Sequence, residues 1–244
     1  MKNTDFNTEK IIGILLITGA LALFVPYTLL TITFDYPNIL REDTGVILTR
    51  FKAGGNALIW TWFAFALVGL PLLGAYVLMG QKLENKSWFV RLATIIGILG
   101  LVVQMIGLLR WTFVVPVLAT NFANGNEMTK EASTVAFQVI HQYGGVILGE
   151  HLGQLFTIGW TVMMSMVFHK LRLFPTWLIG MGYVASAIYL LAQAELFATV
   201  MPDFPVWDLA GFLGSTLWLI WLVIVGVKFL KMRVENSEFD LIRR

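Results

Sequence analysis

The chain has 244 residues, of which 57% are hydrophobic and 13% charged, and its mean hydropathy is +0.76. A soluble domain usually has about 25% charged residues, so this composition excludes an ordinary soluble protein and indicates one that crosses a membrane several times. The net charge of +2 gives no reason to expect a nucleic-acid partner. The lack of cysteine excludes disulfides, thiolate metal sites and cysteine nucleophiles.

Six segments are long and apolar enough to span a bilayer: 11–33, 55–79, 92–119, 145–168, 175–199 and 210–230. At about 1.5 Å per residue, each helix can cross a hydrocarbon core of about 30 Å. The segments show no period-two alternation, and lipid offers no partners to backbone groups, so they are predicted to be helices. The first is longer than a signal-peptide core and is expected to be retained. The sequence therefore predicts one all-α domain, residues 1–244, built as a six-helix membrane bundle.

Prolines interrupt the first three spans, at Pro26, Pro71 and Pro116. A proline removes a helical hydrogen bond and clashes with the preceding turn, so each is expected to kink its helix. Discontinuous helices line binding sites in some transporters, but a plain kink is the ordinary interpretation.

Basic residues are concentrated before the first span, in the second and fourth connections and after the last span. The fifth connection has none. By the positive-inside rule both termini are predicted to be cytoplasmic. The first connection is the exception, since Arg41, Arg50 and Lys52 would lie outside.

Two outer connections have apolar residues at roughly helical spacing. They are 36–51, with Ile39, Leu40, Ile47 and Phe51, and 127–143, with Val135, Val139, Ile140 and Tyr143. A break is expected at Gly144–Gly145, because one helix over 128–168 would be too long for a single span. Both stretches are expected on the outer surface as amphipathic segments, either as interfacial anchors or as a lid over a pocket.

Three charged side chains are predicted to lie at one depth in the outer leaflet. Counting the helical rise from the cytoplasmic side places Arg110 and Glu150 about 27 Å up, and Glu195 about 30 Å up. A charge inside a membrane costs a few kcal/mol unless it is compensated. We therefore expect Glu150 to pair with Arg110, and Glu195 to join them.

Neutral residues surround this predicted charged layer. Asn56 and Trp60 begin the second span near the same level. Gln154 lies one helical turn from Glu150 on the same face. Trp111 follows Arg110 and is expected either over a cation or at the head-group level.

The charge count suggests a binding site. Arg110 stays protonated and one glutamate neutralises it, so the second glutamate needs a proton, a protonated His151 or a cationic guest. The leading hypothesis is that the protein binds a lipid or a small amphipathic ligand, with Arg110 pairing an anionic head group. The predicted ligand-binding residues are Arg110, Glu150, His151, Glu195, Asn56, Gln154 and Trp111.

Three alternatives stay open. The layer can be an ion-pair lock that only holds helices together. Glu150 or Glu195 can act as the general base of an intramembrane enzyme, which makes catalysis an open question. The third alternative is a proton-coupled transporter, against which the lack of an internal repeat and of a column of charges both count.

No metal or cofactor is assigned from the sequence. A site made of His151, Glu150 and Glu195 is a minor alternative, and no HExxH pattern is present. Haem is disfavoured because His141, His151 and His169 all lie on or beside the fourth span. The expected partners are membrane lipids, with no nucleic acid, and the oligomeric state is left open.

The third span closes with "RWTFVVPVLA" and the fourth contains "GEHLGQLFTIGWT". With six spans and a helical first outer connection, the chain resembles a bacterial family of multi-pass membrane proteins known mainly as a domain of unknown function. The resemblance covers nearly the whole chain. It implies an integral plasma-membrane protein of about six helices, and it implies no reaction and no catalytic residue.

Overall fold

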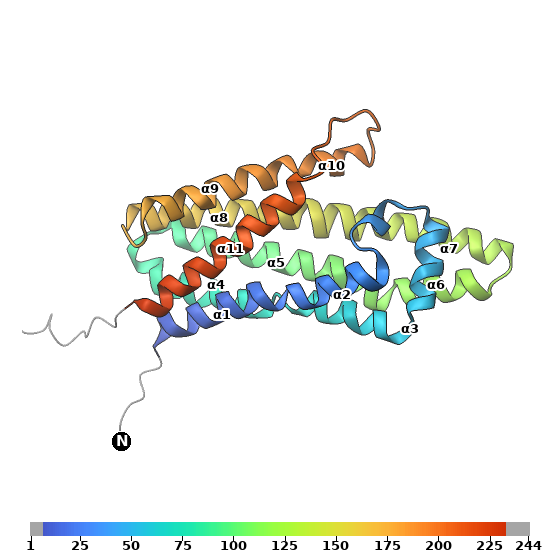
Figure 1. Ribbon diagram of the computed structural model, residues 1–244, viewed down its shortest axis with the longest axis horizontal. Helices are drawn as coiled ribbons and strands as arrows, with labels where there is room; N and C mark the ends of the chain where they lie inside the picture. Colours follow the sequence, from blue (N-terminus) through green and yellow to red (C-terminus); the bar gives the residue numbers. More distant parts are fainter. Residues whose placement is uncertain (1–6, 233–244) are drawn as a thin grey trace, which may run out of the picture.

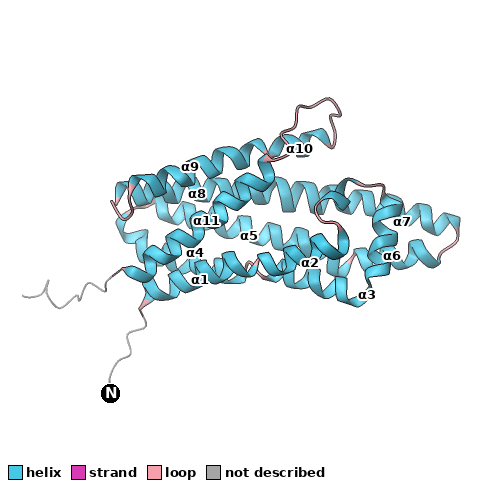
Figure 2. Ribbon diagram, in the orientation of Figure 1, coloured by secondary structure: helices cyan, strands magenta, loops and turns pink. Residues whose placement is uncertain are grey.

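The computed structural model describes residues 7–232, and over that range the chain is helical without any strand (Figure 2). The helices lie side by side in an elongated bundle, and the described chain begins and ends at the same end of it, on the left of Figure 1. Within this range, five helices are long and apolar enough to cross a membrane: Thr8–Phe34, Thr44–Lys86, Phe89–Asn124, Thr176–Ala198 and Ala210–Lys231. The prediction of an all-helical chain is confirmed for the described residues, and five of its helices have the length and composition needed to cross a membrane.

The elements follow one another with short connections. They are α1 (Thr8–Ala22), α2 (Phe24–Phe34), η1 (Asn38–Arg41), α3 (Thr44–Leu67), α4 (Leu70–Leu83), η2 (Glu84–Lys86), α5 (Phe89–Phe113), α6 (Val115–Asn124), α7 (Glu127–Ile140), η3 (His141–Leu152), α8 (Gly153–Lys170), α9 (Thr176–Leu191), α10 (Gln193–Ala198) and α11 (Ala210–Lys231).

Each of the first three apolar rods consists of two helices that meet just before a proline. α1 and α2 meet at Leu23, before Pro26, and α5 and α6 meet at Val114, before Pro116. α3 and α4 are separated in the same way before Pro71. Proline cannot donate to the preceding turn and its ring crowds that turn, which explains where the breaks fall. The expected kinks are confirmed.

The predicted fourth span, 145–168, lies within one uninterrupted helical rod that runs through α7, η3 and α8. This rod is not among the five apolar helices. It carries Glu150, His151 and Gln154 in its middle.

The break expected at Gly144–Gly145 was wrong, because the rod passes through these glycines as the π-helix η3. The glycines instead allow two helices to touch. A Cβ on Gly107 of α5 would lie 2.6 Å from the carbonyl oxygen of Gly144 and 2.7 Å from the Cα of Gly149. The small residues therefore serve close packing between α5 and η3.

The first outer connection is not a single helix over 36–51. It forms the short turn η1 and then the first part of α3, which bends at Gly55, where φ is 56°. This left-handed conformation favours glycine. The first part of α3 consequently runs across the bundle axis and the rest runs along it (Figure 1). The four predicted apolar residues are buried: Ile39, Leu40, Ile47 and Phe51.

The second outer segment forms α7, as expected, but with the opposite face inward. Val135, Val139 and Tyr143 are exposed, whereas Ser133 and Phe137 are buried. The predicted apolar face of this segment therefore points away from the bundle.

Two hydrophobic cores fill the bundle. The termini-side core joins α1, α4, α5, α8, α9 and α11, and it includes Tyr76, Trp160, Trp218, Trp221 and Phe229. The loop-side core joins α2, η1, α3, α5, α6 and α7. It is rich in aromatic residues and includes Phe34, Phe51, Trp62, Phe65, Trp111 and Phe137. Of the predicted site residues, Trp111 belongs to the loop-side core.

Candidate functional site

Arg41, the last residue of η1, joins two glutamates from distant parts of the chain. Its Nη2 lies 3.2 Å from Oε2 of Glu150 in η3 and 2.9 Å from Oε1 of Glu195 in α10. Its Nε also donates to Oε1 of Glu195 at 3.0 Å. This Arg41 bridge is partly accessible, since the side chains of Arg41, Glu150 and Glu195 are 33%, 23% and 48% exposed. It ties the first outer connection to the fourth and fifth expected spans.

Local structure fixes the position of Arg41. α2 ends where Asp35 takes the left-handed conformation, with φ 57°. The Asp35 carboxylate then accepts hydrogen bonds from Asn38 at 3.3 Å and from Arg50 at 3.4 Å. Buried Ile39 and its neighbour Leu40 anchor η1 to the loop-side core. Burial acts to lower the pKa of Arg41, but the charges of the two glutamates outweigh it and raise this pKa above its ordinary value.

Beside the bridge, His151 begins a chain of neutral side chains. Its Nδ1 lies 2.6 Å from Oε1 of Gln193, and Nε2 of Gln193 donates to Oε1 of Gln154 at 2.5 Å. This amide–imidazole chain connects η3, α10 and α8. We refer to the Arg41 bridge and the amide–imidazole chain together as the polar layer.

The expected ion pair between Arg110 and Glu150 was wrong. Among residues 7–232, no carboxylate oxygen lies within 4.0 Å of the Arg110 guanidinium. Its Nη1 instead turns back to the carbonyl oxygen of Gly107, and its Cζ lies 5.1 Å from the ring centre of Trp111. The depth of each residue along its own helix could not show that Arg41, which lies in the connection after α2, forms ion pairs with both glutamates.

A glycine makes room for Arg110. A Cβ on Gly145 would lie 2.5 Å from its Nη2 and 2.9 Å from its Cζ. The guanidinium therefore lies against the backbone of η3, and its side chain is only 6% exposed.

Trp111 is fully buried at the centre of the aromatic cluster. Its ring stacks on Trp62 at 4.7 Å and on Phe51 at 5.7 Å between centroids. The expectation that Trp111 lies over a cation is confirmed, because Arg110 is its neighbour. The side chain is enclosed by other aromatic rings and is 0% exposed.

His141 lies at the edge of the same cluster, stacked on Phe137 at 5.2 Å and edge-on to Trp111 at 6.2 Å. Burial, together with the positive charges of Arg110 and Arg41, lowers the pKa of His141 to about 4. The imidazole is therefore neutral near pH 7. Burial also raises the pKa of Tyr36, and the charge of Glu150 acts in the same direction.

Several buried nitrogens here lack a hydrogen-bond partner within residues 7–232. They are Nε of Arg110, Nε1 of Trp62 and Trp111, and both ring nitrogens of His141. Buried polar atoms in proteins are usually satisfied, so such a group of atoms calls for an explanation.

Other predicted residues lie apart from the polar layer. Asn56 is exposed on α3 and makes no hydrogen bond with the layer's described residues. Gln104 of α5 also lies apart from the layer: it donates to the Gly153 carbonyl and the Thr157 hydroxyl, both at 2.9 Å, and so joins α5 to α8.

The minor metal alternative, made of His151, Glu150 and Glu195, is not supported. No group of three His, Asp or Glu ligands comes together in the part of the chain that the structure describes. His151 turns to Gln193 instead.

Arg41 and His141 are the residues that sequence reasoning missed as site candidates. A signal for Arg41 was present, because the first outer connection was the one that departed from the expected distribution of bases. His141 carried no comparable signal, since its isolation depends on how the aromatic rings pack around it.

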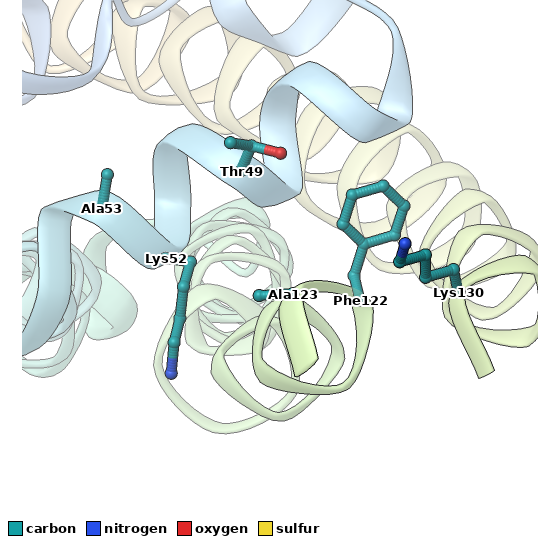
Figure 3. A pocket seen from close by; sticks show the side chains of 6 residues that line it. All are labelled: Thr49, Lys52, Ala53, Phe122, Ala123 and Lys130. Atoms are coloured by element: carbon teal, nitrogen blue, oxygen red, sulfur yellow. The ribbon is translucent and has the colours of Figure 1, made fainter. Parts of the chain in front are cut away.

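A shallow depression of about 490 Å³ lies elsewhere, between the first part of α3 and the α6–α7 hairpin (Figure 3). It is lined by Thr49, Lys52, Ala53, Phe122, Ala123 and Lys130. Its two lysines already bond to Thr120 and Glu127, both at 3.0 Å. None of the predicted site residues lies in it.

The comparisons with known proteins agree with an assignment to a family without an established activity. No curated protein and no solved structure matches the chain. One family does match, over residues 11–226, which include every helix that carries the polar layer. The chain belongs to the family described as Domain of unknown function (DUF4386).

Proposed function

We propose that this protein is a six-span protein of the bacterial plasma membrane, with both termini cytoplasmic, that binds a lipid or small amphipathic molecule at its polar layer. Six spans require the polar rod of α7, η3 and α8 to cross the membrane beside the five apolar helices. The position of both described chain ends at one end of the bundle supports an even number of crossings (Figure 1).

The observation that carries the ligand-binding proposal is the accessibility of the Arg41 bridge beside apolar surface. Glu195 is about half exposed. Exposed apolar side chains flank it in sequence, at Leu191 and Phe197. Tyr143, on the rod that carries Glu150, is also exposed. An amphipathic molecule could therefore place its head on the charges while its tail lies along this apolar flank.

The chemistry of the bridge suits reversible recognition. The Arg41 guanidinium is shared by the carboxylates of Glu150 and Glu195. The bridge therefore contains two acidic groups and one basic group. A head group with donors can bind a glutamate, and one with acceptors can bind the free positions of the Arg41 guanidinium. A bridge that acts only as a lock between segments is the competing interpretation, since it joins η1, η3 and α10.

The test is to identify what remains bound to the gently purified protein. We expect native mass spectrometry of the wild type to show a stoichiometric extra mass, and solvent extraction to release an amphipathic molecule. Arg41→Gln should lower that content by about tenfold, as expected for loss of a charged hydrogen-bonding partner.

Glu127→Gln is the matched control, because it removes a carboxylate that pairs with Lys130 outside the polar layer, and it should leave the bound mass unchanged. A bare mass in several mild detergents would contradict ligand binding. So would a folded Arg41→Gln protein with undiminished ligand.

A further inference from the structure

Next to the polar layer, and covered by the aromatic cluster, lies a group of hydrogen-bond donors without acceptors. We infer that Arg110, Trp111 and His141 form a buried receptor for an oxyanion, a carboxylate or a phosphate, carried by the head of the bound molecule. This inference rests on the proposed function, because it names the head-group class of the ligand proposed there.

The first argument is that no carboxylate of the described residues contacts the Arg110 guanidinium. Arg110 as a whole residue is only 6% exposed. Buried arginines are nearly always paired, because an isolated charge in an apolar environment is costly. The two nearby carboxylates, Glu150 and Glu195, are both bound by Arg41. A guanidinium has five N–H donors, and the one hydrogen bond that Arg110 makes is to the carbonyl oxygen of Gly107.

The second argument is the character of the surrounding groups. The indole nitrogens of Trp62 and Trp111 can only donate, and neither has an acceptor. The Arg110 guanidinium lies over the Trp111 ring, and Trp111 stacks on Trp62. A surplus of buried donors beside a cation is complementary to a ligand that is rich in acceptors and negatively charged.

The third argument is the state of His141. Both of its ring nitrogens are buried and neither makes a hydrogen bond of ordinary geometry, although the Leu40 backbone lies close enough to oppose the lowering of the His141 pKa. A neutral imidazole offers one donor and one acceptor. The donor suits a carboxylate or phosphate oxygen, and the acceptor can receive a proton from a hydrogen phosphate. His141 therefore adds directional hydrogen bonding without adding a third positive charge.

The fourth argument is the way the glycines position the guanidinium. A Cβ on Gly145 would lie 2.5 Å from Nη2 of Arg110, and a Cβ on Gly144 would lie 3.4 Å from its Cδ. The two glycines therefore let the guanidinium pack directly against the backbone of η3, which fixes its orientation. The aromatic rings on the other side exclude water, which strengthens an ionic hydrogen bond.

The inference is tested with amphiphiles that share one tail and differ only in the head: decanoate, decyl phosphate, decanol and decyltrimethylammonium. Binding is measured by native mass spectrometry titration and by the thermal shift of the detergent-solubilised full chain. We expect decanoate or decyl phosphate to bind at least about tenfold more tightly than the neutral and cationic amphiphiles. The carboxylate and phosphate arms then show which oxyanion is preferred.

Substitutions of the receptor residues test whether they bind the anionic head group. Arg110→Gln should abolish the preference for the anionic heads, and Arg110→Lys, which keeps the charge but loses the planar fork, should weaken it by about tenfold. Trp111→Phe removes the indole N–H and should weaken anion binding by a few fold. Arg91→Gln is the matched control on the same helix, since Arg91 pairs with Glu84 away from the site.

The outcomes separate the two proposals. If all four amphiphiles bind equally and Arg110→Gln changes nothing, the oxyanion inference is overturned while the proposed function stands. If none of the four binds to the wild type, both fail. If both arginine variants fail to fold, Trp111→Phe and His141→Gln decide, because unchanged anion binding in both folded variants would also overturn the inference.

Discussion

The two hydrophobic cores of this protein are packed alike but satisfy their polar groups differently. Each contains stacked aromatic rings: Tyr76 on Trp160 at 3.7 Å in the termini-side core, and Trp62 on Trp111 at 4.7 Å in the loop-side core. In the termini-side core the indole nitrogens of Trp218 and Trp221 donate to protein oxygens, both at 3.0 Å. In the loop-side core the corresponding indole nitrogens have no acceptor, and a buried arginine lies beside them.

The two cores therefore differ in how well their buried polar groups are satisfied by hydrogen bonds. The termini-side core also contains unpartnered hydroxyls, at Tyr76, Ser165 and Ser186, but these are neutral. An unpartnered neutral hydroxyl costs far less than a buried guanidinium that no carboxylate contacts. The loop-side half is therefore the half whose sequence is harder to explain by folding alone.

The largest expected effect tests whether the two cores are equally well packed. Trp111→Ala and Trp160→Ala each remove a fully buried indole from an aromatic stack. Each should lower the free energy of unfolding by about 3–5 kcal/mol. Equilibrium unfolding in detergent measures this, with exposed Trp88→Ala as the control. If Trp111→Ala costs much less than Trp160→Ala, the unpartnered donors reflect loose packing rather than a binding site.

A smaller effect is expected from the charges. Arg41→Gln leaves Glu150 and Glu195 close together without their shared cation, and should destabilise the protein by about 1–2 kcal/mol at neutral pH, because the bridge is only partly buried. The corresponding change at the termini-side end, Arg91→Gln, breaks the pair with Glu84, whose two side chains are 68% and 36% exposed, and should cost about 0.5 kcal/mol. Thermal unfolding of the two variants side by side measures the contrast. Equal losses would show that the Arg41 bridge is an ordinary surface ion pair.

The smallest effect concerns pH and His141. Its pKa in the folded protein, about 4, is lower than the ordinary value of 6.5, so the unfolded chain binds more protons between these values. Stability should therefore fall as the pH decreases from 6.5 towards 4, and His141 should add no pH dependence above that window. His141→Phe should flatten the curve within the window, as measured by unfolding at a series of pH values.

Phe137→Leu is the control for this measurement, because it disturbs the ring that stacks on His141 without removing a titrating group. It should lower stability by a similar amount at every pH. A curve for His141→Phe as steep as that of the wild type would show that other groups cause the acid sensitivity.

Composition and hydrophobic runs were enough to predict an all-helical membrane bundle, because lipid leaves the backbone few other ways to satisfy its hydrogen bonds. The prolines were enough to place three breaks, since their effect is local to one turn. The helical spacing of apolar residues also identified which side chains of the first outer connection are buried in the loop-side core. These predictions rest on interactions within a single segment.

Tertiary structure alone decided which charges meet. Depth along each helix correctly brought Glu150 and Glu195 together, but it could not orient a returning connection, so the partner was Arg41 rather than Arg110. The continuous path through Gly144–Gly145 depended on contact with Gly107 of another helix, and local propensity alone favours a break at two glycines. The isolation of Arg110 and His141 likewise follows from rings contributed by α2, α3, α5 and α7. The sequence specified what each segment is, and packing between segments specified which polar groups were left without a partner.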